Sequence, residues 1–347
     1  MSFTSSLNVT HPIIQAPMAG ANATPPALVA AVGNAGGLGF IGAAYMSPEQ
    51  IVRESAAIRA LTVHPFGINL FAPVESPPPP TAAQVQSAIG AIATYHDELG
   101  LSAPAAPPAP AFRFEDQLSV ALECGARVFS FTFGQVPPSA MRALKARHIY
   151  VIGTATTVDE AMLLERSGVD AIAAQGSEAG AHRGTFAAPF ESAMIGTMAL
   201  VPQIVRAVRV PVLASGGIMT GRGIAAATAL GAAAVQMGTA FLTTHECGVA
   251  ETHKRAILDA TEDATRVTRA FSGRPARGIV NRAMTEIETA PAAILPYPYQ
   301  NSLTRVMRNA ASDQDRAEFL SLWAGQGVRL ARRMGAAELV RTLVAES

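Results

Sequence analysis

A nine-residue loop gathers most of the side chains that could do chemistry in this chain. An apolar run at residues 171–174 leads into it, and it then carries Gln175, Glu178, His182 and Arg183 between small residues. A buried strand that opens into such a loop presents functional groups at the C-terminal edge of a barrel or an open sheet. The imidazole of His182 could act there as a general base. A solvated loop histidine is the competing interpretation.

Two glycine-rich turns indicate a binding site for a phosphate group. Residues 214–218 (ASGGI) follow one apolar run, and residues 236–239 (QMGT) close the next. Barrel enzymes commonly bind phosphate between the loops after their seventh and eighth strands, through backbone N–H groups that glycine brings close to the ligand. Tight turns without a ligand are the alternative. The presence of both turns in these two places favours phosphate binding.

Further residues favour a flat phosphorylated cofactor such as FMN. Residues 15–20 offer apolar backbone suited to lying against a ring, and Asn69 and Gln175 could hydrogen-bond its edge or its phosphate. No set of carboxylates, histidines or cysteines has metal-ligand spacing, so we expect no metal. No nucleophilic serine or cysteine lies in a recognisable frame. A cofactor that carries the reaction, with a protein base beside it, fits these residues.

Eight short apolar runs predict the strands that position these groups. They lie at residues 13–18, 38–44, 66–71, 128–133, 150–153, 171–175, 212–215 and 234–237. Helices are expected between them at residues 24–35, from 47 onward, 81–99, ending near 124, 139–147, 158–167, 195–208 and 222–230. Continuous apolar runs joined by helical crossovers are typical of buried parallel strands. Eight such repeats predict an α/β fold, a (β/α)8 TIM barrel.

The C-terminal part departs from this repeat. Residues 246–310 are polar and predict helices without strands, and residues 315–346 predict helices that close the barrel. We therefore expect an FMN-binding barrel built from residues 1–245 and 311–347. Residues 246–310 would form an inserted helical substrate or lid subdomain.

Composition limits the partners and the compartment. Lys+Arg and Asp+Glu balance at 26 each, which gives no electrostatic reason to expect nucleic acid or an anionic membrane as a partner. Two cysteines are too few for a disulfide framework, so a reducing compartment, the cytoplasm, is expected. Residues 1–11 show no signal peptide, and the uncharged stretches 12–48 and 223–244 resemble core more than membrane spans. A homodimer is compatible with the sequence, which does not define the oligomeric state.

Several motifs, in order, resemble the nitronate monooxygenase family, formerly called 2-nitropropane dioxygenases. They are residues 15–18 (QAPM), 67–69 (GIN), 175–184 (QGSEAGAHRG), 214–218 (ASGGI) and 236–239 (QMGT). Three later stretches resemble its bacterial class I branch, namely residues 271–278 (FSGRPARG), 297–301 (YPYQN) and 322–327 (LWAGQG). The similarity spans almost the whole chain, and the ordered motifs together are far more specific than any one of them.

The resemblance implies an FMN-dependent oxidoreductase that oxidises alkyl nitronates, such as propionate 3-nitronate, with O₂ to a carbonyl compound and nitrite. It places His182 at the catalytic position. The cofactor-binding residues expected from the resemblance and the strand ends are Pro17, Met18, Asn69, Gln175, Gly180, Gly216, Gly217, Gln236, Met237, Gly238, Thr239 and Tyr299. One departure is visible, because Ala181 occupies a position where a second glycine is expected. Ala181 would be strained there if its φ angle were positive.

Neighbouring polar residues have plainer expected roles. We expect Arg183 to anchor its own loop, and Glu178 to pair with Arg183 or to cap a turn. His245 and His253 are expected to be solvated. Gln300 is expected to line the site beside Tyr299, while Trp323 fits the site and the core equally well.

Two roles for His182 and several functions stay open. A general base with an ordinary pKa near 6.5 would make nitroalkane turnover rise with pH, whereas an imidazolium that holds the nitronate anion would give the opposite slope. An NAD(P)H:quinone or enoyl-thioester reductase on the same FMN barrel is the main alternative function. A non-flavin phosphate-binding aldolase or isomerase, and a non-catalytic flavin-binding protein, are the others.

Overall fold

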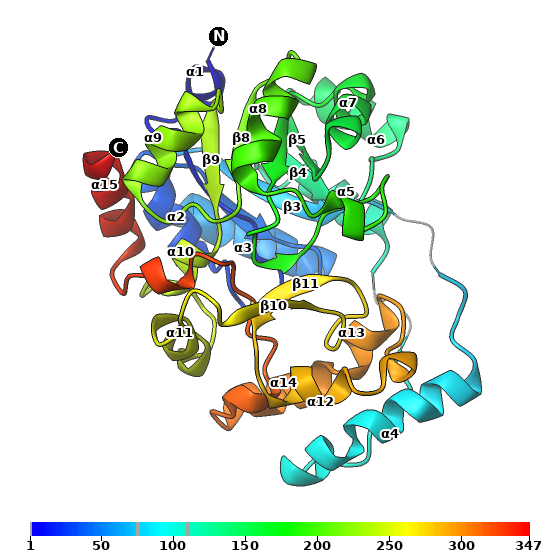
Figure 1. The fold of residues 1–347 in the computed structure, drawn as a ribbon. Helices are drawn as coiled ribbons and strands as arrows, with labels where there is room; N and C mark the ends of the chain where they lie inside the picture. The colour runs from blue at the N-terminus through cyan, green and yellow to red at the C-terminus, as the bar shows by residue number, and fades with distance from the viewer. Residues whose placement is uncertain (1, 74–76, 109–111) are drawn as a thin grey trace.

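Eight parallel strands form a barrel at the centre of the molecule (Figure 1). A computed structural model describes residues 2–73, 77–108 and 112–347. The barrel strands are β1 (Ile13–Gln15), β2 (Gly39–Gly42), β3 (Phe66–Phe71), β4 (Val128–Thr132), β5 (Tyr150–Ala155), β6 (Ala171–Gln175), β8 (Val212–Ser215) and β9 (Ala234–Met237). They pair in the order β1-β9-β8-β6-β5-β4-β3-β2, and a parallel bridge between Ile14 and Leu38 joins the two ends. The predicted TIM barrel is therefore confirmed.

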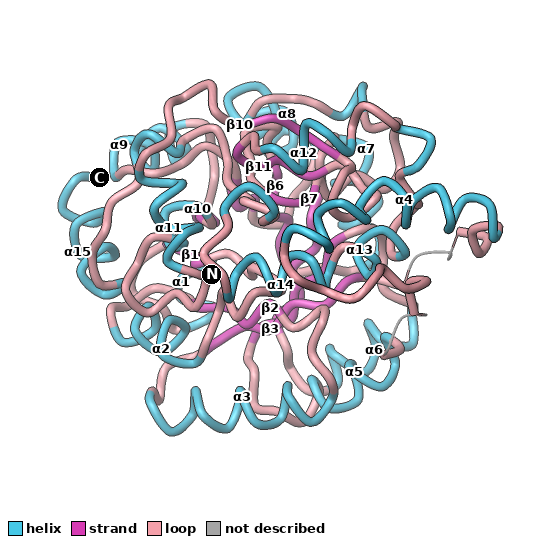
Figure 2. The backbone as a smooth tube through the Cα atoms, turned by 90° about the horizontal axis from the view of Figure 1, so that it is seen from below, coloured by secondary structure: helices cyan, strands magenta, loops and turns pink. Residues whose placement is uncertain are grey.

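Helices surround the strands (Figure 2). They are α2 (Pro26–Asn34), α3 (Pro48–Leu61), α5 (Phe114–Ala121), α6 (Pro138–Ala146), α7 (Val158–Ser167), α8 (Thr197–Ala207), α9 (Gly221–Ala229) and α15 (Ala336–Glu346). The C-terminal α15 packs between α2 and α9, and so completes the ring. Side chains cap several helices where the sequence places them: Ser47 and Gln50 form a capping box on α3, and Thr157 caps α7.

The alternation of side chains along the strands divides the core in two. One set points into the barrel, where Ile14, Phe40 and Ile152 pack together and the short α1 (Phe3–Leu7) covers the N-terminal end. The other set, including Ile172, packs against the helices. Because both faces of a parallel sheet are buried, its strands read as continuous apolar runs. Among the described residues, no helix combines the length and apolar character needed to cross a lipid bilayer.

The segment after the eighth barrel strand contains strands as well as helices, so the expectation of helices alone was wrong. It holds α10 (Thr239–Leu242), α11 (Glu251–Leu258), β10 (Thr265–Thr268), β11 (Ala276–Ile279), α12 (Arg282–Ile287), η2 (Pro291–Ala293), α13 (Tyr299–Leu303) and α14 (Arg305–Asp313). The strands β10 and β11 are short and carry arginines, which hides any apolar pattern. They form a three-stranded antiparallel sheet with β7 (Ala181–His182), from the loop after β6.

The last part of the chain is also less helical than expected. Between α14 and α15 lie only the short 3₁₀ turns η3 (Ala317–Phe319) and η4 (Val328–Leu330). Part of this stretch runs beside β11, where Gly278 bridges to Trp323. The expected boundary at residue 310 falls inside α14. We keep a barrel with an inserted subdomain as a proposal, with the insertion extended to the end of α14.

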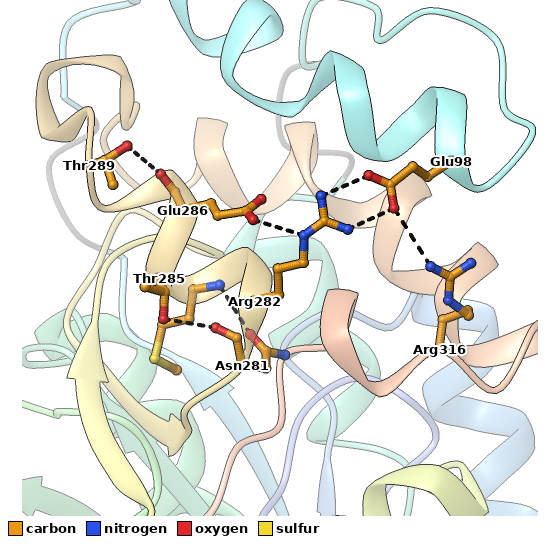
Figure 3. A network of polar contacts seen from close by, with 8 residues as sticks. Glu98, Asn281, Arg282, Thr285, Glu286, Thr289 and Arg316 are labelled. Atoms are coloured by element: carbon orange, nitrogen blue, oxygen red, sulfur yellow. Dashed lines mark hydrogen bonds and ion pairs between the residues drawn. The ribbon is translucent and has the colours of Figure 1, made fainter.

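The helix α4 (Ala82–Glu98) lies apart from the barrel (Figure 1) and contacts the inserted segment. Arg282, at the start of α12, donates to both carboxylate oxygens of Glu98 at 2.7 and 2.8 Å and to Glu286 at 2.8 Å (Figure 3). Arg316 also reaches Glu98, at 3.7 Å. Partly exposed pairs of this kind contribute little individually. Their network fixes where the end of α4 rests on the insertion.

Candidate active site

The loop after β6 is held from both sides by its own side chains. Gln175, the last residue of β6, donates to the carbonyl of His182 at 3.0 Å and accepts from the N–H of Gly184 at 2.8 Å. The buried guanidinium of Arg183 donates to the carbonyls of Gln175 and Ala193. Arg183 thus anchors its own loop, as expected. These bonds hold the backbone of His182 at the C-terminal end of the barrel.

Glu178 serves the same loop as a cap. Its carboxylate accepts from the backbone N–H of Thr197 at 2.9 Å and from the Thr197 hydroxyl at 3.0 Å. A carboxylate at the first turn of α8 satisfies otherwise unpaired N–H groups. Of the two roles considered for Glu178, capping is therefore the one observed.

Ala181 adopts the left-handed conformation that its position suggested. Its φ angle is +58°, in a region that residues other than glycine rarely occupy. Such a conformation costs on the order of 1–3 kcal/mol and persists only where the surroundings impose it. Here β11 imposes it, because Arg277 and Ala276 pair with Ala181 and His182. The strain lies directly beside the candidate base.

Aromatic side chains from four segments enclose the ring of His182. The ring centroids of Phe133, Tyr297 and Trp323 lie 5.6, 5.8 and 6.0 Å from the imidazole, and that of Phe71 lies at 6.3 Å. Burial, reinforced by the positive charges of Arg274 and Arg308, lowers the pKa of His182 to about 3. The imidazole is therefore neutral at ordinary pH. The ordinary pKa near 6.5 expected from the sequence does not apply, because burial by these distant segments could not be foreseen.

A cavity of about 350 Å³ lies beside His182, at the C-terminal ends of the barrel strands. This volume is in the range of small-molecule sites. Among the predicted residues that line it are Pro17, Met18, Asn69, Gln175, Gly180, His182, Gly216, Gly217, Gln236, Met237, Gly238 and Thr239. The structure therefore brings together all the predicted site residues except one. Among the described residues that line it there is no aspartate or glutamate.

The exception is Tyr299, which does not line the cavity. It begins α13 and packs, partly buried, against the core. Tyr297, two residues earlier, presents its ring to His182 instead. The amide of Gln300 is used by the backbone, since it donates to the carbonyl of Ala270 and accepts from the N–H of Leu295. Gln300 is thus a brace within the insertion and does not line the cavity.

Backbone donors face the cavity at its glycine-rich end. Gly216 and Gly217 have φ angles of +111° and +74°, which glycine adopts without strain. The N–H groups of Gly217, Ile218 and Gly238 donate to no protein acceptor within the described parts of the chain. Unpaired donors on a cavity wall suit an anionic group such as a phosphate.

The cavity wall also carries positive charge. Arg305 and Arg308, both on α14, line it, and the guanidinium of Arg274 lies 3.9 Å from the centroid of the Phe133 ring. None of these three arginines forms an ion pair with a described carboxylate. Within residues 2–73, 77–108 and 112–347, no cluster of three or more histidine, cysteine or acidic side chains is arranged to hold a metal ion.

His253 is buried, so the expectation that it is solvated was wrong. It lines the cavity, and its Nε2 lies 3.1 Å from the carbonyl oxygen of Trp323. Burial lowers its pKa to about 4. The indole of Trp323 itself fills both roles considered for it, since it lines the cavity and packs edge-on against Phe271 at 5.7 Å. His245, by contrast, is exposed as expected.

The depressed pKa of His253 should make stability depend on pH. As the pH falls below about 6.5, the imidazole of His253 binds a proton in the unfolded chain, whereas in the folded chain it stays neutral until about pH 4. Its contribution to stability is complete above pH 6.5, and this histidine should cost on the order of 1 kcal/mol between pH 7.5 and 5.5. Denaturant unfolding of wild type and His253→Gln at both pH values measures it. Between the two pH values, the free energy of unfolding of His253→Gln should fall by less than that of wild type, and the difference should equal this amount. An equal fall in both proteins would contradict the lowered pKa of His253.

Comparison with known proteins places the chain in a family. The family model described as "Nitronate monooxygenase" matches residues 1–346. The chain belongs to the nitronate monooxygenase family.

Relatives support this membership over the whole length. A probable nitronate monooxygenase of Staphylococcus saprophyticus is 42% identical over 346 residues, which cover 99% of this chain and 96% of that protein. One of Staphylococcus aureus is 43% identical over 342 residues, 98% of this chain and 95% of its own. Membership of the nitronate monooxygenase family makes the chain an oxidoreductase.

Solved structures share the fold. A nitroalkane oxidase from Streptomyces ansochromogenes is similar with a TM-score of 0.91 and 40% identity, covering 100% of this chain and 97% of its own. FabK from Thermotoga maritima is similar with a TM-score of 0.76 and 30% identity, covering 99% and 94%. The higher TM-score belongs to the nitroalkane oxidase.

Sequence reasoning missed several residues of the candidate site. Among them, Ser272, Tyr297, Arg308 and His253 all come from the inserted segment, His253 from its helix α11. The motifs at residues 271–278 and 297–301 were visible, but their place in space was not. Only the pairing of β11 with β7 brings the insertion onto His182.

Proposed function

We propose that the protein oxidises alkyl nitronates, with FMN as cofactor and O₂ as co-substrate, to a carbonyl compound and nitrite. The observation that carries this proposal is a half-buried, neutral imidazole on a cavity that is also lined by residues with unpaired backbone donors and by arginines without an ion-pair partner among the described carboxylates. Family membership and the nitroalkane oxidase neighbour support the same reaction class. Such a cavity suits an anionic substrate beside a phosphorylated cofactor.

The residues present fit FMN. The N–H groups of Gly217, Ile218 and Gly238 suit its phosphate, and the apolar residues Pro17 and Met18 suit the face of its ring. FMN would supply the one-electron chemistry with the nitronate and with O₂. The chain itself would bind and orient the substrate, exclude water and move a proton.

His182 is proposed to accept that proton. The base form of the imidazole is already present at ordinary pH because its pKa lies at about 3. For a neutral nitroalkane, the proton on the carbon next to the nitro group moves to His182, and the electron pair of that C–H bond stays on the substrate as the nitronate. A preformed nitronate needs no such transfer. The positive charges of Arg274 and Arg308 would stabilise the nitronate anion in the enclosed site, whether it forms there or enters preformed.

The proposed substrate carries a carboxylate, as propionate 3-nitronate does. Arg305 lines the cavity, is exposed and lies near the ring of Tyr45, with no described carboxylate beside it. Arg305→Gln should raise the KM for propionate 3-nitronate about three- to fivefold, because an exposed charge contributes modestly. The KM for ethyl nitronate, which has no carboxylate, should change less than about twofold. Arg329→Gln, which removes an exposed arginine paired with Glu262, is the matched control. Equal effects on both substrates would contradict the carboxylate assignment.

One experiment tests the function as a whole. The absorption spectrum of the pure protein is recorded, and the protein is then titrated without O₂, first with propionate 3-nitronate and separately with NADH. A flavin spectrum that bleaches with the nitronate alone is the expected result. Bleaching only with NADH would replace the proposal with the reductase alternative. A colourless protein that binds no added FMN would favour an aldolase or isomerase, and a flavin that no donor reduces would indicate a binding protein.

Asn69 is expected to contribute to FMN binding. Its amide is buried in the C-terminal half of β3, lines the cavity and donates to the hydroxyl of Ser130 at 2.8 Å. Asn69→Leu would leave polar groups of the site and of the cofactor unpaired, which should weaken FMN binding by about 1–3 kcal/mol. Asn34→Leu, at the exposed end of α2, is the control. An unchanged FMN dissociation constant in Asn69→Leu would make Asn69 structural only.

A further inference from the structure

The segment at residues 271–278 touches His182 in two ways. Its strand β11 pairs with the backbone of His182, through Ala276. Its buried Ser272, 1% exposed, places Oγ 2.9 Å from Nε2 of the imidazole. One piece of the insertion therefore holds both the main chain and the ring of the candidate base.

The hydrogen bonds of Ser272 can be counted. The hydroxyl lies 3.0 Å from the carbonyl oxygen of Arg274, which can only accept, and it accepts from the N–H of Arg274 at 3.3 Å. The single hydroxyl proton is used in the bond to that carbonyl. The contact with His182 is then a hydrogen bond only if Nε2–H donates to Oγ. Nδ1 is left without a proton and has no hydrogen-bond partner among the described residues, so it is the ring nitrogen free to act as the base.

The turn that presents this hydroxyl is fixed. Gly273 has a φ angle of +80°, and a Cβ added there would meet the carbonyl oxygen of Leu295 at 2.1 Å. The side chain of Arg274 packs on Phe133 and donates to the carbonyl of Thr185, across the loop that carries His182. The Ser272 hydroxyl oxygen is therefore held in place as a hydrogen-bond acceptor for the ring of His182.

We infer that Ser272 is a positioning residue that fixes His182 as the Nε2–H tautomer and makes Nδ1 the atom that receives the substrate proton. The inference rests on the proposed function, in which His182 is the base. When the proton moves from the substrate carbon to Nδ1, the C–H electron pair remains on the nitronate and the imidazolium keeps its Nε2–H bond to Ser272. The charged groups facing the ring are the cations Arg274 and Arg308, with the phenol of Tyr297 beside it. Among the described residues no acidic side chain lines the cavity, and Ser272 is the one described side chain within hydrogen-bond distance of a ring nitrogen of His182.

The tautomer can be measured directly. Protein loaded with FMN and labelled with ¹⁵N-histidine contains seven histidines, and His182→Asn identifies the signal of His182 by its loss. Long-range ¹H–¹⁵N correlation spectra distinguish the two neutral tautomers. Wild type should show Nε2–H alone, whereas Ser272→Ala should show a mixture or the Nδ1–H form. A wild-type His182 protonated on Nδ1 would overturn the inference, whatever the variants do.

Kinetics provide the second readout. With neutral nitroalkane, Ser272→Ala should lower kcat about tenfold or more, because only part of the enzyme presents Nδ1 as a base. With preformed nitronate, kcat should change less than about threefold, and Ser272→Thr, which keeps the hydroxyl, should recover the nitroalkane rate. Equal losses on both substrates would indicate a structural role and overturn the inference. If His182→Asn keeps full activity, the proposed function fails, while the spectra still decide the tautomer.

Discussion

His182→Asn should lower kcat for neutral nitroalkanes by about 10²–10⁴-fold while the protein keeps its fold and its FMN. Asparagine has similar polarity but no basic nitrogen, so it cannot take the proton. It can still accept or donate a hydrogen bond toward Ser272, which lies 2.9 Å from the imidazole. Activity on a preformed nitronate should fall much less, because that substrate has already lost its proton.

Stopped-flow reduction of the bound flavin, with nitroalkane and nitronate in separate experiments without O₂, measures the two effects. His148→Asn is a matched control, because His148 is exposed at the N-terminal end of β5 and has a φ angle of +54° that asparagine tolerates. If both substrate forms reduce the His182→Asn flavin at wild-type rates, His182 is not catalytic and the proposed function loses its base.

The pH dependence follows from the same residue. A base must be unprotonated, so activity through His182 is present above its pKa and is lost as the pH falls through about 3. Nitroalkane turnover should therefore show no inflection from His182 near pH 6.5, contrary to the slope expected from an ordinary imidazole. The pH profile of kcat/KM, compared with that of His182→Asn, checks this. A histidine that held the anion as an imidazolium would instead give nitronate turnover that falls as the pH rises.

The barrel could be predicted from the sequence because its strands are buried on both faces. Runs such as residues 171–175 need no partner to be recognised, since their composition alone distinguishes them. The small sheet is different, because β10 and β11 are short, carry Arg266 and Arg277, and exist through pairing with the loop after β6. The sequences of β10 and β11 contain no local pattern that predicts their pairing with that loop.

The candidate site likewise contains residues that local sequence patterns predict and residues that depend on distant segments. Residues at barrel strand ends, such as Asn69 and Gly217, could be predicted because the fold sends every strand end to one edge. The contact with Ser272 depends on a residue 90 positions further along the chain. The neutral state of His182 depends on burial by aromatic rings from four separate segments. Tyr297 and Tyr299 show the limit, since the motif was recognised but only the folded backbone decides which of the two rings packs against His182.

Gly217→Val should weaken FMN binding strongly and lower turnover with it. Gly217 has a φ angle of +74°, where a β-branched residue is a conformational outlier, and a Cβ there would lie 3.2 Å from Cβ of Glu178. Relief of this strain, of order 1–3 kcal/mol, would move the backbone N–H groups of Gly217 and Ile218 away from their present positions on the cavity wall. We expect FMN affinity to fall at least about tenfold.

Gly100→Val separates loss of the site from general strain. Gly100 has a φ angle of +67°, nothing within 4 Å of an added Cβ, and a position at the exposed end of α4. The Gly100→Val variant should therefore carry the cost of a valine at positive φ, while its flavin content stays at the wild-type level. Flavin absorbance per protein, FMN dissociation constants by fluorescence titration and thermal unfolding are compared for wild type and both variants. A yellow Gly217→Val protein with full flavin content would contradict the assignment of the phosphate to this part of the cavity. A folded chain could then bind FMN without the backbone conformation that Gly217 allows.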